Sequence, residues 1–364
     1  MDFFIFLVSF FLYAHDEGGM VKFPQGYPLS SRISVDEKLS ILYESPLCEK
    51  IEFDFNVVAV NGKVTNGKIS FEMWIPQNPS PKSDMKNDVI YTIIKPSRYK
   101  IYPNGRFWAR FDVNGRVSQF KFVVVNEGVD EKSFGIDIYE ANVSKIDKKK
   151  RQAEEIVDDS NLNLADPLPF KLIRRDQWKA NPPTASYIKH TPKKITIHHT
   201  AGGYPLKYED AITEIKVIQE YHQEGRGWID IGYHFLIDPL GDIFEGRPIL
   251  SVGAHVAKQN TDNIGISIMG NYHPPLNNEI TEKTISAIIT LIRFIKDKYN
   301  ISKAYFYAHR DLAATNCPGD NIYAKMNYLK TKIFDEENEN TMAVEVDLGD
   351  NEINRKIINS ISEW

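Results

Sequence analysis

Three side chains in the last third of the sequence could together hold a metal ion. His198 lies in the string ITIHHTAGG, and His309 and Cys317 lie in AHRDLAATNCPGD. Two imidazoles and one thiolate leave the fourth position of a tetrahedral zinc ion free for water, which is the pattern of catalytic rather than structural zinc sites. Tyr233 and Thr315 add hydroxyl groups that could act beside such an ion. This combination of residues predicts metal-assisted hydrolysis.

Composition limits the class of protein. With 364 residues the chain is long enough for two domains, and its hydrophobic fraction of 42% is that of a globular protein. The formal net charge is −5 and no long basic face is present, so nucleic acid is not expected as a partner. A disulfide between the two cysteines, Cys48 and Cys317, would remove the thiolate ligand. We expect Cys48 instead to be a small buried core residue.

The N-terminus contains an apolar run from Phe3 to Ala14. This run is too short to span a bilayer, but it suits the apolar core of a signal peptide. Asp2 precedes it and no Lys or Arg does, which departs from the usual positive start. We expect residues 1–19 to be a signal peptide and the protein to be secreted or periplasmic, at the cell envelope. A mis-assigned start codon and a membrane-tucked tail are the alternatives, and no other segment is a transmembrane candidate.

Residues 20–142 have the pattern of a β sandwich. Short segments that alternate apolar with polar residues are separated by Asn-Gly and Pro-Asn-Gly turns. These segments are IEFDFNVVAV, GKISFEMWI, DVIYTIIKP, GRFWARFDV and SQFKFVVV. Strands spaced in this way favour an all-β, sandwich-like accessory domain. Its aromatic residues Trp74, Tyr102, Phe107 and Trp108 fit either a surface that stacks on sugars or the half-buried core of the sandwich.

Two segments are dominated by charge. Residues 143–167 contain the basic run KIDKKKR followed by the acidic run AEEIVDD, and residues 334–364 form an acidic stretch. We interpret the first segment as a charged linker rather than as an element that binds nucleic acid. The second is interpreted as a tail, to which we assign no chemistry.

Residues 168–333 alternate expected strands with expected helices. The clearest helix has isoleucines and a leucine at helical spacing between residues 280 and 299, with Thr281 near its start. The expected strands are 194–199, 232–238, 242–246, 264–269 and 304–308, and the expected helices are 207–223, 280–299 and 320–333. Such alternation implies an α/β domain with a central mixed β sheet flanked by helices.

Six strings within this part of the chain resemble one protein family. They are RRDQWKANPP, IHHTAGG, GWIDIGYHF, EGRPILSVGAHV, NIGISIMGNY and HRDLAATNCPGD. In order and spacing they are similar to those of the peptidoglycan-recognition-protein and N-acetylmuramoyl-L-alanine amidase family, whose enzymes are zinc amidases with a T7-lysozyme-like domain. The resemblance covers less than half of the chain. One departure is Lys179, which stands where the family often has glycine.

The resemblance implies a Zn²⁺ site on His198, His309 and Cys317. His198 matches the family's metal-binding histidine, the first of the HH pair. Because successive side chains of a strand point to opposite faces, His199 should face away from the metal. Asp311, between the second and third ligands, is interpreted as a turn or supporting residue.

The resemblance also implies residues that act on the substrate. Tyr233 matches the tyrosine of catalytically competent members and would hold the attacking water and the oxyanion. Thr315 stands where the family uses a threonine or lysine to assist the same step. His255, Asn271 and Arg247 are expected to line the substrate groove.

The implied activity is hydrolysis of the amide bond between the lactyl group of N-acetylmuramic acid and L-alanine, with peptidoglycan or muropeptides as partners. The main alternative is a non-catalytic peptidoglycan-binding receptor, because some members have lost the zinc cysteine. A zinc peptidase or deacetylase on another scaffold would need motifs such as H-E-x-x-H, which are not evident. The N-terminal β domain is expected either to target the enzyme to the cell wall or only to cap it.

Overall fold

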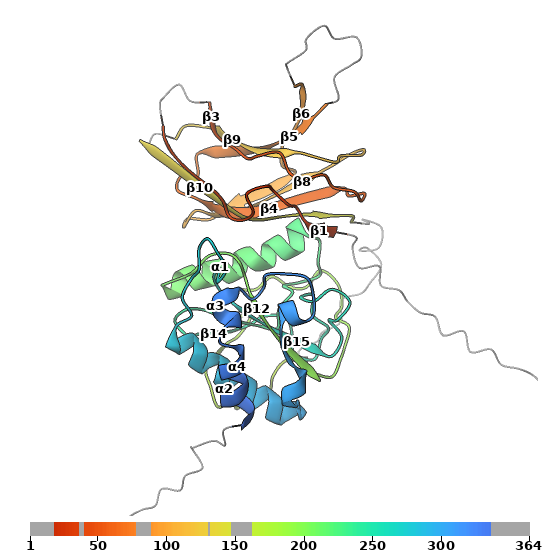
Figure 1. Cartoon of the computed structure of the whole chain (residues 1–364), viewed down its shortest axis with the longest axis vertical. Helices are drawn as coiled ribbons and strands as arrows, with labels where there is room; N and C mark the ends of the chain where they lie inside the picture. Colours follow the sequence, from red (N-terminus) through yellow and green to blue (C-terminus); the bar gives the residue numbers. More distant parts are fainter. Residues whose placement is uncertain (1–17, 36–39, 78–88, 130–131, 147–161, 336–364) are drawn as a thin grey trace, which may run out of the picture.

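The computed structural model describes residues 18–35, 40–77, 89–129, 132–146 and 162–335. Two bodies of secondary structure share these residues (Figure 1). An N-terminal β region, residues 18–146, lies against one side of a C-terminal α/β region, residues 162–335. Residues 1–17 of the predicted signal peptide, 147–161 of the predicted linker and 336–364 of the predicted tail lie outside the described residues. Gly18 and Gly19, which the prediction placed in the signal peptide, belong to the first strand of the N-terminal β region. Within the described residues, no helix combines the length and apolar character that crossing a membrane requires.

The N-terminal β region consists of two antiparallel sheets stacked face to face (Figure 1). The first has the order β1-β10-β4-β8-β7, with β2 also paired to β10. Its strands are β1 (Gly18–Met20), β2 (Leu29–Ser34), β4 (Val57–Val64), β7 (Arg98–Ile101), β8 (Arg106–Asp112) and β10 (Ser133–Ser144). The second sheet has the order β3-β9-β5-β6. Its strands are β3 (Ile41–Glu44), β5 (Ile69–Pro76), β6 (Tyr91–Ile94) and β9 (Lys121–Asn126).

Strand periodicity builds the core between these sheets. Buried and half-buried side chains alternate along the whole of β5, as they do in a strand with one face on the core. Phe71 of β5 stacks on Phe107 of β8 with ring centroids 4.6 Å apart, which ties one sheet to the other. Cys48 lies in the same core and is a free thiol, as expected. Its Sγ accepts a hydrogen bond from the backbone N–H of Phe120 at 3.3 Å.

The sequence patterns found five of these strands and missed the others. The alternating segments correspond to β4, β5, β6, β8 and β9, whereas β1, β2, β3, β7 and β10 were not anticipated. The longest strand, β10, continues through Ser144 because Ala141 and Val143 point into the sandwich core. Residues 143 and 144, which the prediction placed in the charged linker, therefore belong to this strand.

The C-terminal α/β region has a six-stranded sheet of order β11-β14-β13-β15-β12-β16. Its strands are β11 (Leu172–Ile173), β12 (Lys194–His199), β13 (Phe235–Ile237), β14 (Ile243–Glu245), β15 (Asn263–Ile268) and β16 (Phe306–Ala308). Only the pair β13–β14 is antiparallel, so the sheet is mixed, as predicted. Its helices are α1 (Tyr208–Glu220), α2 (Glu282–Tyr299), α3 (Asp320–Tyr323) and α4 (Met326–Lys330). The helix predicted over 320–333 is thus broken into short pieces.

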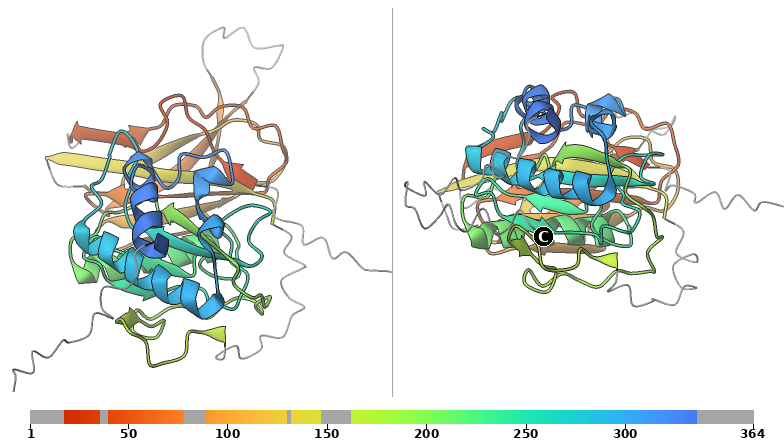
Figure 2. Two further views of the ribbon diagram at one scale, coloured as in Figure 1. Left: turned by 60° about the horizontal axis from the view of Figure 1, so that its bottom comes forward. Right: turned by 90° about the horizontal axis from the view of Figure 1, so that it is seen from below.

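The two long helices cover opposite faces of this sheet. Phe235 and Ile237 of β13 belong to the apolar core that contains α2, whereas Leu236 between them belongs to the core that contains α1. Figure 2, seen from below, brings α2 to the front, away from the N-terminal β region. In β12, Ile197 lies in the α2 core. The next side chain, that of His198, therefore points to the α1 face.

Local sequence explains where α2 begins and ends. The Thr281 hydroxyl accepts a hydrogen bond from the backbone N–H of Thr284 at 3.0 Å, which caps the first turn at the predicted start. Asn300 ends the helix in the left-handed conformation, with φ of 54°, which asparagine tolerates better than most residues. α2 thereby covers the sheet on the side remote from His198.

Helix α1 is apolar on two sides. One side packs on its own sheet, and the other contacts the N-terminal β region. At this boundary Val217 of α1 and Tyr221, the first residue of the π-helical turn that continues α1 (Tyr221–Gly225), pack with Ala59, Tyr102 and Trp108. The hypothesis that Tyr102 and Trp108 form a surface for sugars is therefore wrong, since both are buried against α1. Phe107 is likewise buried, but inside the sandwich.

Charged groups reinforce the boundary. The guanidinium of Arg106, on β8, donates to both carboxylate oxygens of Glu214 on α1, at 2.5 and 3.0 Å. Both side chains are almost fully buried, with 4% and 3% exposed. Lys100 and Trp108 donate to the carboxylate of Glu220 at 2.7 and 3.1 Å. The two regions therefore share a buried, hydrogen-bonded interface and are not separate bodies on a tether.

Candidate active site

The three predicted metal ligands come from adjacent places at one edge of the C-terminal sheet. His198 is the fifth residue of β12, and β16 pairs with β12 in parallel. Because the carboxyl ends of parallel strands meet at one edge, the turn after β16 brings His309 next to His198, and their ring centroids lie 4.5 Å apart. Cys317 follows on the loop after this turn, where the backbone N–H of Arg310 donates to its carbonyl at 2.9 Å.

The spacing of the ligand atoms suits zinc. One atom from each of His198, His309 and Cys317 lies within 4.8 Å of the other two, and Nδ1 of His198 is 3.6 Å from Sγ of Cys317. Zinc–nitrogen and zinc–sulfur bonds of about 2.05 and 2.3 Å at a tetrahedral angle would place these two atoms about 3.6 Å apart. The donor set, two nitrogens and one sulfur, therefore fits a tetrahedral zinc ion with one open position.

A chain of hydrogen bonds sets the tautomer of His198. Nε2 of His198 lies 3.0 Å from Nδ1 of His255, and Nε2 of His255 lies 3.0 Å from the carbonyl oxygen of Asn263. A carbonyl can only accept, so His255 must donate from Nε2 and accept at Nδ1. His198 then carries its proton on Nε2 and keeps the Nδ1 lone pair for a metal ion. A Cβ at Gly265 would lie 2.6 Å from the His255 ring, which explains the glycine there.

His199 is turned away from this arrangement, as strand alternation predicts. Its Nδ1 accepts a hydrogen bond from the backbone N–H of Tyr272 at 3.3 Å, and burial lowers its pKa to about 3. Asp311 is a turn residue, since its Oδ2 accepts from the backbone N–H of Ala308 at 2.8 Å. Neither residue belongs to the ligand set His198, His309 and Cys317.

Burial makes charge costly at the ligands. It raises the pKa of the Cys317 thiol to about 12 and lowers the pKa of His309 to about 4. The site therefore disfavours a thiolate unless a cation compensates its charge, which is the condition that a bound metal ion would supply.

Two hydroxyl groups lie beside the ligands. The Tyr233 ring centroid is 5.4 Å from that of His198, and burial raises the pKa of its phenol, with the nearby Cys317 and Glu140 adding to the shift. The phenol therefore keeps its proton and is a donor. The Thr315 hydroxyl accepts from the backbone N–H of Cys317 at 3.2 Å, which leaves its own hydrogen free to donate elsewhere.

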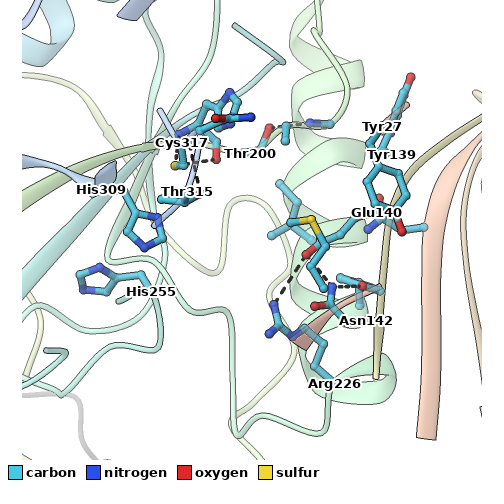
Figure 3. Close-up of a pocket in the computed structure, with 18 of the residues that line it drawn as sticks. Tyr27, Tyr139, Glu140, Asn142, Thr200, Arg226, His255, His309, Thr315 and Cys317 are labelled. Carbon is cyan, nitrogen blue, oxygen red and sulfur yellow. Dashed lines mark hydrogen bonds and ion pairs between the residues drawn. The ribbon is translucent and has the colours of Figure 1, made fainter. Parts of the chain in front are cut away.

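These groups line a cavity of about 1010 Å³ at the boundary between the two regions. Figure 3 shows His309, Thr315 and Cys317 on one side of it. Tyr139 and Glu140, from the N-terminal β region, lie across from them. The volume is that of a site for a ligand of several linked units rather than for a single ion.

Comparison with known proteins connects this geometry to a family. The N-acetylmuramoyl-L-alanine amidase family matches residues 188–320. Peptidoglycan-recognition protein SC2 of Drosophila simulans is 37% identical over 162 residues, which are 43% of this chain and 84% of that protein. The chain belongs to the peptidoglycan-recognition protein and amidase family.

Two further relatives span the same part of the chain. Peptidoglycan recognition protein 1 of Mus musculus is 29% identical over 170 residues, covering 44% of this chain and 88% of that protein. A solved structure, peptidoglycan recognition protein-LE in complex with tracheal cytotoxin, is 30% identical, covers 43% of this chain and 92% of its own, and has a TM-score of 0.41. The residues that match the family model, 188–320, lie in the C-terminal α/β region.

Of the three predicted substrate-binding residues, two line the cavity and one does not. Asn271 lines the cavity. His255 also lines it, but both of its ring nitrogens are engaged, one of them with His198. Arg247 does not line the cavity, contrary to the prediction, because its guanidinium is buried and donates to the backbone carbonyls of Ile231, Val252 and Asp230. It supports the loops around Tyr233 instead.

Sequence reasoning missed the residues that come from the N-terminal β region. Tyr27, Tyr139, Glu140 and Asn142 line the cavity, yet they lie outside the stretch that matches the family. Three of them lie on β10, the strand whose pattern was not recognised. A signal was available in the alternation of IDIYEANV, although alternation alone could not show which cleft its outer face would meet.

Proposed function

We propose that this protein is a zinc-dependent N-acetylmuramoyl-L-alanine amidase, which hydrolyses the amide bond between the lactyl group of N-acetylmuramic acid and L-alanine. The observation that carries the proposal is the ligand set of His198, His309 and Cys317. Within it, the hydrogen bond from Nε2 of His198 to His255 leaves Nδ1 of His198 unprotonated and able to bind a metal ion. The site opens on a cavity large enough for a muropeptide. The names of its relatives agree on peptidoglycan as the ligand.

A zinc ion held by these three residues would supply Lewis-acid chemistry, polarising the scissile carbonyl and making a water molecule more acidic. The chain's own groups then have defined tasks. Tyr233 is a protonated donor beside His198 and stabilises the negative charge that develops on the carbonyl oxygen. Thr315 is positioned by Cys317 N–H so that its hydroxyl hydrogen is available to the reacting groups. Both side chains are half-buried and line the cavity, so their hydroxyl groups are accessible to a ligand bound there.

The test is incubation of the zinc-loaded full chain with a defined muramyl tripeptide, with and without a chelator, followed by mass spectrometry. We expect N-acetylmuramic acid and free tripeptide, and intact substrate when the chelator is present. Tyr233→Phe should lower kcat on the order of 10²-fold while zinc content stays at one ion per chain. Cys317→Ser should lose the metal as well as the activity.

A non-catalytic receptor is the alternative within the family. Intact substrate with and without zinc, together with measurable muropeptide binding, would establish that alternative and refute the amidase. Full turnover by Tyr233→Phe would leave the amidase in place but refute the role given to the phenol.

A further inference from the structure

The cavity at the metal-binding residues is closed on its far side by the N-terminal β region. The lining on that side comes from the chain around Tyr27, which follows β1, and from β10, which supplies Tyr139, Glu140 and Asn142. Figure 3 shows these side chains across the cavity from His309 and Cys317. Neither segment belongs to the stretch that matches the amidase family, residues 188–320. We call them the β wall.

The β wall is held in place by the interface with α1. The buried pair of Arg106 with Glu214 joins the two regions directly beside the cavity, which both residues also line. Asn142, on the wall itself, donates from its side-chain amide to the hydroxyl of Tyr221 at 2.8 Å. A module that only tethered the enzyme to a surface would need no such fixed contacts. The interface therefore favours a wall that is part of the cleft.

A row of rings leads from Tyr221, whose hydroxyl accepts the hydrogen bond from Asn142 of the β wall, to the metal ligand His198, and it gives the scale of the cleft. Tyr221, His222, Tyr233 and His198 follow one another with centroid separations of 6.1, 5.9 and 5.4 Å. The row thus spans at most about 17 Å, whereas an extended three-residue peptide spans about 10 Å and a long side chain adds roughly 6 Å. A ligand cleaved at the metal could therefore reach the wall with a side chain about three residues from the cleaved bond.

Glu140 is the group on the wall that could recognise such a side chain. Its side chain is 23% exposed, and its Oε1 accepts from the Asn142 amide at 2.5 Å. Arg226 forms an ion pair with the same oxygen at 3.8 Å, a separation too long for a hydrogen bond. Arg226 is also held over the Trp228 ring, 4.1 Å from its centroid. A carboxylate accepts about four hydrogen bonds, so Glu140 has capacity for a further donor from the cavity.

We propose that the β wall is part of the substrate cleft and that Glu140 determines which peptides are accepted. Its carboxylate would accept hydrogen bonds from an ammonium group on a side chain of the peptide that is attached to N-acetylmuramic acid. This inference rests on the proposed function for the identity of the ligand. It assigns the N-terminal β region to substrate selection, whereas the sequence left open whether that region targets or caps the enzyme.

The experiment compares two muramyl tripeptides that differ only in the third residue, whose side-chain amine is free in one and acetylated in the other. For the zinc-loaded full chain we expect kcat/KM about tenfold higher for the free amine, since a charge-assisted hydrogen bond contributes about that factor. Glu140→Gln should lose most of this preference. The control Glu44→Gln removes a carboxylate that pairs with Lys121 on the other sheet, and it should keep the preference.

Each outcome decides between the two proposals. Hydrolysis of both peptides at equal rates by the unaltered protein, or an unchanged preference in Glu140→Gln, would overturn the role of Glu140 and leave the amidase standing. If neither peptide is hydrolysed, the amidase is refuted. Calorimetric Kd values for the same two peptides then test whether Glu140 binds the amine. A tenfold difference in Kd that Glu140→Gln abolishes would support this role of Glu140, and equal Kd values would overturn it.

Discussion

Arg106 offers the sharpest test of the interface between the two regions, because it compensates a buried charge. The Glu214 carboxylate accepts from Nε and Nη2 of Arg106 and from the backbone N–H of Gly203 at 3.0 Å. Arg106→Met would leave this carboxylate buried with Gly203 as its remaining donor. Removing one partner of a buried ion pair costs about 3–5 kcal/mol, and we expect a loss of that size in the free energy of unfolding.

The second arm of the experiment neutralises both partners. In Arg106→Met/Glu214→Gln no charge is left uncompensated, and the new amide oxygen can still accept from Gly203. Replacing a buried pair as a whole is often close to neutral, so the double variant should be at least about 2 kcal/mol more stable than the single variant Arg106→Met. Together with the single variant Glu214→Gln, these measurements give the coupling energy of the pair in a double-mutant cycle.

The assay is urea unfolding of the full chain, followed by tryptophan fluorescence and by far-UV circular dichroism. Since the interface is buried, both probes should report one transition for the unaltered protein. The control pair Arg32–Asp137 joins two strands of one sheet, and Arg32 is 59% exposed. Arg32→Met should therefore cost at most about 1 kcal/mol. Additivity of Arg106→Met and Glu214→Gln to within about 0.5 kcal/mol would refute the reasoning.

Three further predictions follow from single side chains. His255→Phe removes the acceptor for Nε2 of His198 and should weaken zinc binding about 10–100-fold in chelator competition; unchanged affinity would contradict the assigned tautomer. Asp238 is buried, and desolvation raises its pKa to about 6, so the folded state binds more protons than the unfolded state between about pH 4 and pH 6, and stability falls as pH rises through that window. Asp238→Asn should remove this dependence and raise the free energy of unfolding at pH 7 by up to about 2 kcal/mol. If urea titrations show that the free energy of unfolding changes with pH equally in the variant and in the unaltered protein between pH 4 and pH 7, the assignment is refuted. Lys179 has φ of 57°, which costs a residue with a Cβ about 1 kcal/mol, so Lys179→Gly should raise Tm slightly and Lys179→Val should lower it.

Much of the site could be predicted from short-range patterns. The alternation of β12 placed His198 and His199 on opposite faces, and the structure agrees. The Thr281 start of α2 and the mixed sheet also followed from local signals. Lys179 was noticed only as a departure from the family, and its positive φ gives the physical reason why glycine is common there. Each of these features depends on residues that are close together in the chain.

What the sequence could not predict depends on contacts between distant segments. Apolar residues at alternate positions, such as Tyr102 and Trp108, are compatible with a core, a ligand surface or an interface. Their partner Tyr221 lies more than a hundred residues away, and no local pattern identifies it. Arg247 shows the same limit. The sequence prediction assigned it to the substrate groove, but in the structure its guanidinium donates to backbone carbonyls that are distant in sequence or in other loops.

Helix α1 explains why the site and the N-terminal β region belong to one unit. Glu214 holds the N–H of Gly203, in the loop that follows the metal-ligand strand, and its charge is balanced by Arg106 from the other region. A Cβ at Gly203 would lie 2.5 Å from the same carboxylate, so the loop has little room to move independently. The loop next to His199, the helix and the sandwich are therefore joined through one buried carboxylate. A chain without residues 18–146 would lose both the β wall and the cation that balances Glu214, so loss of activity in such a fragment would not by itself distinguish a binding role from a structural one. The single substitution Glu140→Gln, which leaves the Arg106–Glu214 pair intact, makes that distinction.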